Sequence, residues 1–179
     1  MKLFTTLCAS AAVATALTVA AAPNAASAQT PQEVLPLTTD TISQFRTWRN
    51  WQVLRNESRG HCLATMSDES GVIQICLTQD ETLGYIGVFV QEEIPAGASN
   101  DVVIKVGDQT FVGETSGPVG NLGGGWHGGY VLANNQDFRR SIERNNTLTA
   151  FPDQPWAVQL DITGANNAIF EVRQCSDSM

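Results

Sequence analysis

Hydrophobic and polar residues alternate along much of the chain beyond residue 50, with the two-residue period of half-buried β-strands. The clearest example is the run 156–163, in which Trp, Val, Leu and Ile alternate with Ala, Gln, Asp and Thr. The more uniformly apolar run 83–90 is typical of a central strand. Shorter strands are predicted at residues 51–54, 62–66, 72–77, 102–106, 109–112, 130–132 and 147–151.

Turn-forming residues between neighbouring runs predict two tight hairpins. Gly107 and Asp108 form the turn of one of them. Residues 67–71 form the turn of the other. Because Cys62 and Cys76 are equidistant from the centre of that second turn, a simple hairpin would set them opposite each other, close enough for a disulfide.

One segment has a convincing helical pattern, and it covers residues 135–144. Phe138 and Ile142 lie four residues apart and would share its buried face. Asn135 can cap its start, and Asp137 lies in the electropositive first turn. We therefore expect one short amphipathic helix between two strands.

The two ends of the predicted domain are less regular. Residues 29–39 contain two prolines and few core-like residues, which indicates a flexible leader. A short helix is expected at about residues 40–46, capped by Thr39 or Asp40. Residues 165–174 fit a helix and a strand equally well.

Many short strands, frequent turns and few helices indicate the fold class. We expect a mainly β protein, an antiparallel β-sandwich or barrel-like domain with one or two short helices, rather than a parallel α/β sheet. Residues 29–47 would form the leader, and residues 48–179 a single β-rich domain.

The N-terminus predicts export. Lys2 supplies a positive charge, an uncharged apolar run follows, and Ala26 and Ala28 form the small-x-small pattern that precedes signal-peptidase cleavage. A membrane anchor is the weaker interpretation, because the run is rich in Ala and Thr and no charged flank follows it. Residues 1–28 are thus interpreted as a signal peptide, and the mature protein as periplasmic or secreted, or associated with the outer membrane.

Composition limits the partners. The formal net charge of −8 opposes binding to nucleic acid and to anionic lipid, and it equally serves to keep an exported domain soluble. No transmembrane span is expected after signal cleavage, and no cofactor is indicated. Nothing in the sequence specifies an oligomeric state. The expected partner is a protein or another component of the cell envelope.

Three cysteines follow the predicted cleavage site, Cys62, Cys76 and Cys175. Export to an oxidising compartment predicts at least one disulfide, and the odd number leaves one thiol over. All three pairings are open. In the chain-entropy model, the longest loop, from Cys62 to Cys175, would stabilise the fold most.

The most unusual stretch is 113–129, which holds eight of the fifteen glycines. It lacks the lysine and the strand–loop–helix context of a phosphate-binding loop. Trp126, His127 and Tyr130 lie at its end and are candidate binding residues, since aromatic side chains supply much of the energy at interfaces. The other interpretation is a long surface loop whose tryptophan packs onto the core.

Other candidate chemistry is sparse. Histidine occurs only as His61 and His127, without the spacing of a metal site. A nucleophilic pair of Cys76 with His127 is weaker than the interpretation of a buried structural cysteine and a loop histidine. No catalytic residue is therefore assigned.

A short basic patch on the predicted helix is the remaining candidate for binding. Arg139 and Arg140, with Arg144, could hold an acidic partner through bidentate hydrogen bonds. The same arginines could equally form pairs within the helix, with Asp137 and Glu143.

The order of these elements resembles the invasion-associated locus B family, small exported proteins of alphaproteobacteria. The resemblance covers residues 48–175 and is one of spacing and residue class. It is carried by a Trp-led strand, Cys62-Leu-Ala-Thr-Met-Ser, Val102-Val-Ile-Lys-Val-Gly, Gln109-Thr-Phe, a Trp-bearing loop, the helix at 137–144, Val158-Gln-Leu-Asp-Ile-Thr-Gly, Ala168 and Cys175.

The resemblance implies a β-rich exported domain of the periplasm or cell envelope, linked to host-cell invasion, with no established catalytic residues. It also implies the pairing of Cys62 with Cys175, whereas Cys76 departs from the pattern. We therefore expect a non-enzymatic interaction protein. The alternatives are a small-ligand-binding or inhibitor module that uses the loop around Trp126, and an enzyme of unknown type.

Overall fold

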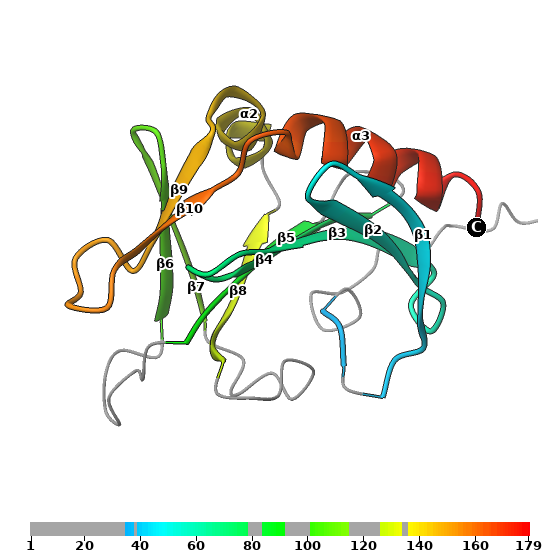
Figure 1. Ribbon diagram of the computed structural model, residues 1–179, viewed down its shortest axis with the longest axis horizontal. Helices are drawn as coiled ribbons and strands as arrows, with labels where there is room; N and C mark the ends of the chain where they lie inside the picture. The colour runs from blue at the N-terminus through cyan, green and yellow to red at the C-terminus, as the bar shows by residue number, and fades with distance from the viewer. Residues whose placement is uncertain (1–34, 38, 79–83, 92–100, 115–125, 134–135) are drawn as a thin grey trace, which may run out of the picture.

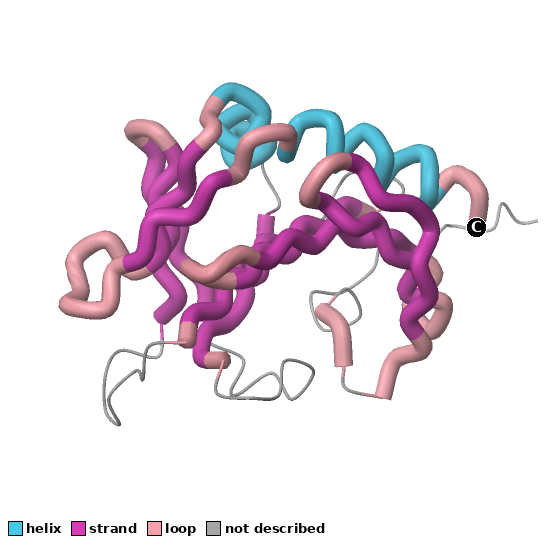
Figure 2. The backbone as a smooth tube through the Cα atoms, in the orientation of Figure 1, coloured by secondary structure: helices cyan, strands magenta, loops and turns pink. Residues whose placement is uncertain are grey.

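The computed structural model describes residues 35–37, 39–78, 84–91, 101–114, 126–133 and 136–179. The predicted signal peptide, most of the glycine-rich stretch and the expected cap Asn135 lie outside the described residues. Ten strands and two helices are described (Figures 1 and 2). They are β1 (Ile42–Trp48), β2 (Trp51–Asn56), β3 (His61–Ser67), β4 (Val72–Leu77), β5 (Gly84–Val90), β6 (Asp101–Val106), β7 (Gln109–Glu114), β8 (His127–Ala133), α2 (Gln136–Arg144), β9 (Thr147–Ala150), β10 (Val158–Asp161) and α3 (Ala165–Ser176).

Two antiparallel sheets build the domain. The larger has the order β1-β2-β3-β4-β5-β8, and the smaller has the order β10-β9-β6-β7. They approach where β7 passes β8, and Gly113 permits this approach because a Cβ there would lie 2.5 Å from the carbonyl oxygen of Tyr130. The described strands form a sandwich without a closed barrel, and this confirms the predicted fold class.

The two helices cover one side of the structure. In Figure 1, α3 lies across one face of the larger sheet, and it contacts β2, β3 and β4. Helix α2 packs beside α3 and against β7, where Phe138 meets the ring of Phe111 edge to face. The helix predicted at 135–144 is thereby confirmed.

Apolar side chains gather in two cores on opposite faces of the larger sheet. The main core lies between the sheets and under α3, and the second core lies on the far face. The strand β5 shows the division, since Ile86 and Val88 belong to the main core whereas Tyr85 and Phe89 belong to the second. All seven residues of β5 are buried, as the uniformly apolar sequence predicted.

The prediction of an N-terminal helix at about residues 40–46 is wrong. Residues 42–48 form β1, which pairs with β2 up to the hairpin partners Trp48 and Trp51. The side chains of Phe45 and Trp48 pack against the main core, and this tertiary contact overrides a weak local helical pattern. The sheet therefore begins before residue 48, inside the segment that the sequence assigned to a leader.

The ambiguous C-terminal segment is a helix. In α3 the buried side chains follow a helical spacing, with Ala168, Ile169, Val172 and Cys175 turned toward the sheet. The other predicted strands are present, although β8 is longer than expected and β10 is shorter.

Candidate functional site

The predicted binding residues of the glycine-rich stretch belong mostly to a strand. His127 and Tyr130 lie in β8, where His127 pairs with Val90 of β5. Trp126 precedes that strand, and its half-buried side chain packs against the second core. The residues 115–125, the remainder of the predicted loop, lie outside the described residues.

Tyr130 lies on a strand, as predicted for residues 130–132, but its side chain is not presented to a partner. Its side chain is 3% exposed and packs edge to face against the rings of Tyr85 and Phe89. Its hydroxyl donates a hydrogen bond to Oε1 of Gln74, at 3.0 Å. Gly87 makes room for the ring, since a Cβ there would lie 2.5 Å from Cε1 of Tyr130. Tyr130 therefore serves the packing of the second core.

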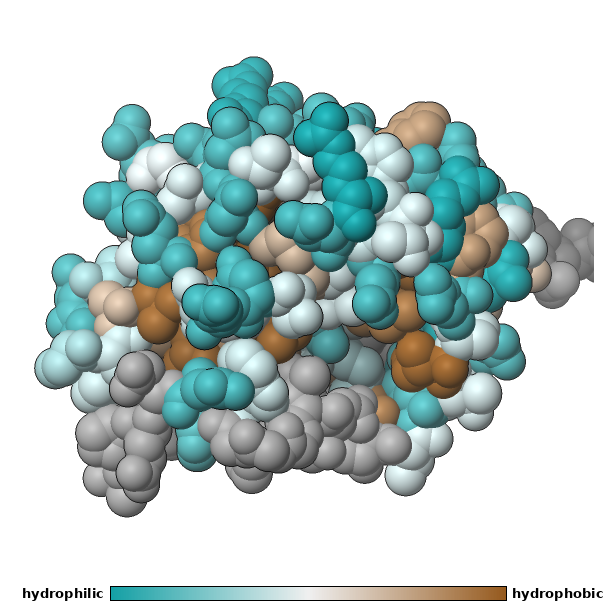
Figure 3. Space-filling view, viewed as in Figure 1, coloured by the Kyte–Doolittle hydropathy of each residue, from teal (hydrophilic) through white to brown (hydrophobic). Residues whose placement is uncertain are grey.

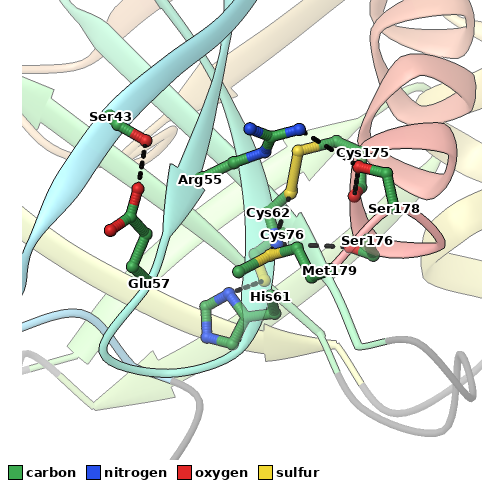
Figure 4. Close-up of a disulfide and its surroundings, with 10 residues drawn as sticks. All are labelled: Ser43, Arg55, Glu57, His61, Cys62, Cys76, Cys175, Ser176, Ser178 and Met179. Atoms are coloured by element: carbon green, nitrogen blue, oxygen red, sulfur yellow. Dashed lines mark hydrogen bonds between the residues drawn. A yellow bond between two sulfur atoms is a disulfide. The ribbon is translucent and has the colours of Figure 1, made fainter.

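The disulfide joins Cys62 of β3 to Cys175 of α3, and the Cα atoms are 6.0 Å apart. Figure 4 shows it on the side of β3 that faces the helix. A hydrogen bond also links β3 to α3, in which the backbone N–H of Cys62 donates to Oγ of Ser176 at 3.2 Å. The pairing that the family resemblance implied is confirmed, and the alternative of Cys62 with Cys76 is wrong.

Cys76 is the free cysteine, and its neighbour is His61 rather than His127. The thiol Sγ lies 3.4 Å from Nδ1 of His61, and both side chains are at most 1% exposed. Figure 4 shows this pair on the far side of β3 from the disulfide. Burial raises the pKa of the Cys76 thiol far above its usual range, and this effect outweighs the opposing influence of the neighbouring Tyr85 hydroxyl.

This geometry makes Cys76 a structural residue. A nucleophilic cysteine needs a thiolate, a depressed pKa and access for its substrate, and the pair of Cys76 with His61 provides the opposite environment. Tyr85 lies directly opposite Cys76 in the strand register, and its buried hydroxyl has no hydrogen-bond partner in the described part of the chain. The cluster thus supplies no reactive group to the surface.

Two arginines of the predicted basic patch, Arg139 and Arg140, lie in different environments. Arg139 lies half-buried with its Nε 3.7 Å from Glu143, whose carboxylate also approaches Arg173 of α3 at 4.0 Å. Arg140 points the other way, and its guanidinium lies 3.4 Å from Asp137. Of these two arginines, Arg140 is therefore the one that is presented to a partner.

Arg140 lines an open groove between α2 and the turn that joins β6 to β7, with a volume of about 590 Å³. The wall from α2 carries Arg140 and Arg144, and the wall from the turn carries Asp108. Gly107, with a φ of 59°, brings the turn close to the helix end. The residues that line it are Val106, Gly107, Asp108, Gln109, Asp137, Arg140, Ser141, Arg144 and Asn145.

The surface around the groove suits polar recognition. Figure 3 shows hydrophilic residues over most of the face seen in Figure 1, with hydrophobic ones in small separate groups. Arg140 and Arg144 offer planar arrays of donors that match a carboxylate, and Asp108 offers an acceptor. The groove can therefore hold a partner segment that carries both carboxylates and hydrogen-bond donors.

A polar cluster that sequence reasoning missed lies at the end of β2. The carboxylate of Asp40 accepts hydrogen bonds from Nδ2 of Asn56, at 2.7 Å, and from Nε of Arg59, at 2.9 Å. Burial acts to raise the pKa of Asp40. The two side-chain hydrogen bonds, a third hydrogen bond from the backbone N–H of Leu37, and the positive charge of Arg59 together outweigh burial, so the pKa lies below its usual value. The cluster anchors Leu37 and Asp40 to the sheet.

Other kinds of site are not indicated in the described residues. No three His, Cys, Asp or Glu side chains of that part gather as metal ligands would. Neither of the two helices in the described ranges, α2 and α3, has the length and hydrophobicity needed to cross a bilayer.

Comparison with known proteins found no match, whether among protein-family models, curated proteins or solved structures.

Proposed function

We propose that this chain is an exported, non-catalytic interaction protein of the cell envelope, periplasmic or secreted, of the kind represented by the invasion-associated locus B family. The observation that carries the proposal is the disulfide between Cys62 and Cys175. Structural disulfides persist in oxidising compartments, and the N-terminal residues 1–28 carry the features of a signal peptide. The order of sequence elements over residues 48–175, which resembles that family, points the same way.

The environment of Cys76 supports a function without catalysis. It is the free thiol among the described cysteines, and burial keeps it protonated beside His61. A protein that binds without chemical turnover has no need of an accessible nucleophile, and a reduced buried cysteine behaves as a small apolar residue.

The groove beside α2 is the surface to which we assign the partner. Arg140 and Arg144 are four residues apart on one helix face, and both line the groove opposite Asp108. Guanidinium groups recognise carboxylates bidentately, so the expected partner is a protein or other envelope component that carries exposed carboxylates.

One experiment in the native host tests both the cellular location of the protein and its partner-binding surface. A photo-crosslinking amino acid at Gln109, which lines the groove and is exposed, should capture one defined envelope component. The same group at Asp153, an exposed residue between β9 and β10, is the control and should capture none. The chain should be recovered from the envelope fraction with its N-terminus at Gln29 and with Cys62 oxidised.

Three results would contradict the proposal. The first is recovery of an unprocessed chain in the cytoplasm with reduced cysteines. The second is equal crosslinking from Gln109 and Asp153, which would remove the groove as the binding surface. The third is turnover of any substrate by the purified protein that disappears in His61→Ala or Cys76→Ala variants that still fold.

A further inference from the structure

A group of arginines lies along one edge of this acidic protein. Half of the eight arginines lie in β1, in β2 and in the turns on either side of β2, although the formal net charge is −8. Arg59 is held by Asp40, at 2.9 Å. The other three are Arg46, Arg49 and Arg55, and they lie close to two aromatic rings.

Each of these three guanidinium groups stacks on an aromatic ring. The Cζ atoms of Arg46 and Arg55 lie 5.2 and 4.8 Å from the ring centroid of Phe45. The Cζ atom of Arg49 lies 4.8 Å from the ring centroid of Trp48. Stacking uses the face of a guanidinium and leaves its in-plane N–H donors free to bond. Arg46 already donates to Glu171 and Arg55 to Ser178, whereas no hydrogen bond within the described residues occupies the donors of Arg49. We call these five residues, Phe45, Arg46, Trp48, Arg49 and Arg55, the β1 rim.

A bulge in β1 creates this arrangement. The pairing with β2 shifts between Gln44 and Arg46, so Phe45 is the extra residue on its strand. Phe45 consequently packs against the main core, while the neighbouring Arg46 bonds to Glu171 of α3 at 2.6 Å. The two consecutive side chains thus approach the side of the sheet covered by α3 instead of alternating.

Arg49 holds a backbone conformation that costs stability. Its φ is 52°, in the left-handed region that glycine and asparagine prefer, and it lies in the two-residue turn between Trp48 and Trp51. Strained residues of this kind cluster at functional sites. The Arg49 guanidinium forms no ion pair with any residue of the described ranges, so its charge is presented to solvent above the Trp48 ring.

The composition of the rim distinguishes between kinds of partner. Arginine, tryptophan and phenylalanine are enriched at the centres of protein interfaces, and Phe170, 53% exposed on α3, lies next to the Glu171 that bonds to Arg46. The negative net charge of the protein disfavours binding of an acidic partner over much of its surface, so such a partner should bind where arginines gather, as they do at this rim. We propose that the β1 rim binds an acidic segment of a partner protein, with Arg49 as the principal contact for its carboxylates. This site is separate from the groove beside α2 and does not depend on it.

A direct binding measurement tests the proposal on the full chain. The probe is a synthetic peptide rich in Glu, titrated by calorimetry at low and at physiological salt, beside a Lys-rich peptide of equal length. We expect binding of the Glu-rich peptide only, weaker at higher salt. Arg49→Gln should weaken it at least tenfold, whereas Lys105→Gln, which removes one exposed positive charge from β6, should leave it unchanged.

An Arg49→Gly variant separates a binding role from a structural one. Glycine relieves the positive φ and removes the guanidinium, so the variant should melt at a higher temperature than the wild type and yet lose peptide binding. If it binds as the wild type does, or if Lys105→Gln weakens binding as much as Arg49→Gln, the proposal is overturned. Binding to a sulfated oligosaccharide or to anionic phospholipid vesicles, but not to the peptide, would likewise overturn it.

Discussion

Leu63 of β3 lies directly opposite Cys76 of β4, and this pairing determines the state of all three cysteines after residue 28. Consecutive residues of a strand point to opposite faces, so Cys62 turns toward α3 and meets Cys175, while Cys76 turns into the second core. A symmetric hairpin would have paired Cys62 with Cys76 instead. An offset of one residue therefore replaces a short local crosslink by one that spans 113 residues.

Loss of this disulfide should destabilise the fold strongly. Replacing Cys62 and Cys175 together by Ala should lower the free energy of unfolding by about 2–5 kcal/mol, because the crosslink restricts a long loop of the unfolded chain. Urea unfolding monitored by tryptophan fluorescence measures the loss. The wild type should lose a comparable amount in reducing agent, whereas the double variant should not respond to it. A wild type that is insensitive to reduction would contradict the prediction.

Cys76 should be unreactive in the folded protein. Burial raises the pKa of its thiol, so at pH 8 it stays protonated and is inaccessible to an alkylating reagent. Iodoacetamide should modify it only after unfolding in urea, and non-reducing peptide mapping should find the label there while Cys62 and Cys175 remain linked. Rapid labelling of Cys76 in the native state would show that the second core opens readily.

Much of the β-structure could be predicted because each strand carries its own pattern. The apolar run of β5 and the alternation through Val158 and Leu160 are local signals, and Gly107 marks its turn by residue type. The strand β1 could not be predicted in this way. Its alternation is broken by the bulge at Phe45, and its place in the sheet depends on contacts with residues much later in the chain.

The candidate site was less accessible to sequence reasoning. Arg140 was identified as a binding residue from charge alone, but the partition between Arg139, turned toward Glu143, and Arg140, turned toward the groove, depends on how α2 packs. The proximity of His61 to Cys76 depends on strand register, to which composition gives no guide. The start of β8 at His127 could not be predicted, because glycines such as Gly128 are typical of a loop but also occur where strands pack closely.

Protonation of Asp40 at acidic pH should reduce the stability of the fold. Its pKa is lowered in the folded state, so its contribution is present above the ordinary value of 3.8 and is lost as the pH falls through the lower folded value. The wild type should therefore be more stable than Asp40→Asn at pH 7, and this difference should shrink below pH 3.8. Urea unfolding at pH 7, 5, 4 and 3 measures it.

The exposed Asp153 provides a matched control for the removal of one negative charge. An Asp153→Asn variant should differ little from the wild type at pH 7, in contrast to Asp40→Asn, which weakens the bonds to Asn56 and Arg59. If both variants lose the same stability, the hydrogen bonds of Asp40 do not anchor the segment that precedes β1.

Gly164, at the start of α3, should not tolerate a side chain. Its φ is 87°, and a Cβ there would lie 2.5 Å from Cζ3 of Trp48, so alanine adds both backbone strain and a clash with a large ring. We expect Gly164→Ala to lower the free energy of unfolding by more than the ~1–2 kcal/mol that a left-handed backbone alone costs an L-residue. Thermal and urea unfolding measure the change.

Gly60 isolates the part of this loss that comes from Trp48. It also has a positive φ, 67°, but nothing lies within 4 Å of its Cβ position, so Gly60→Ala should cost only the backbone strain. In a Trp48→Ala background, the cost of Gly164→Ala should fall to that of Gly60→Ala, because the clashing ring is gone. An unchanged cost in that background would mean that the Trp48 ring does not pack on the start of α3. In that case the contact between the β1 hairpin and the helix would not fix the position of the neighbouring Arg49.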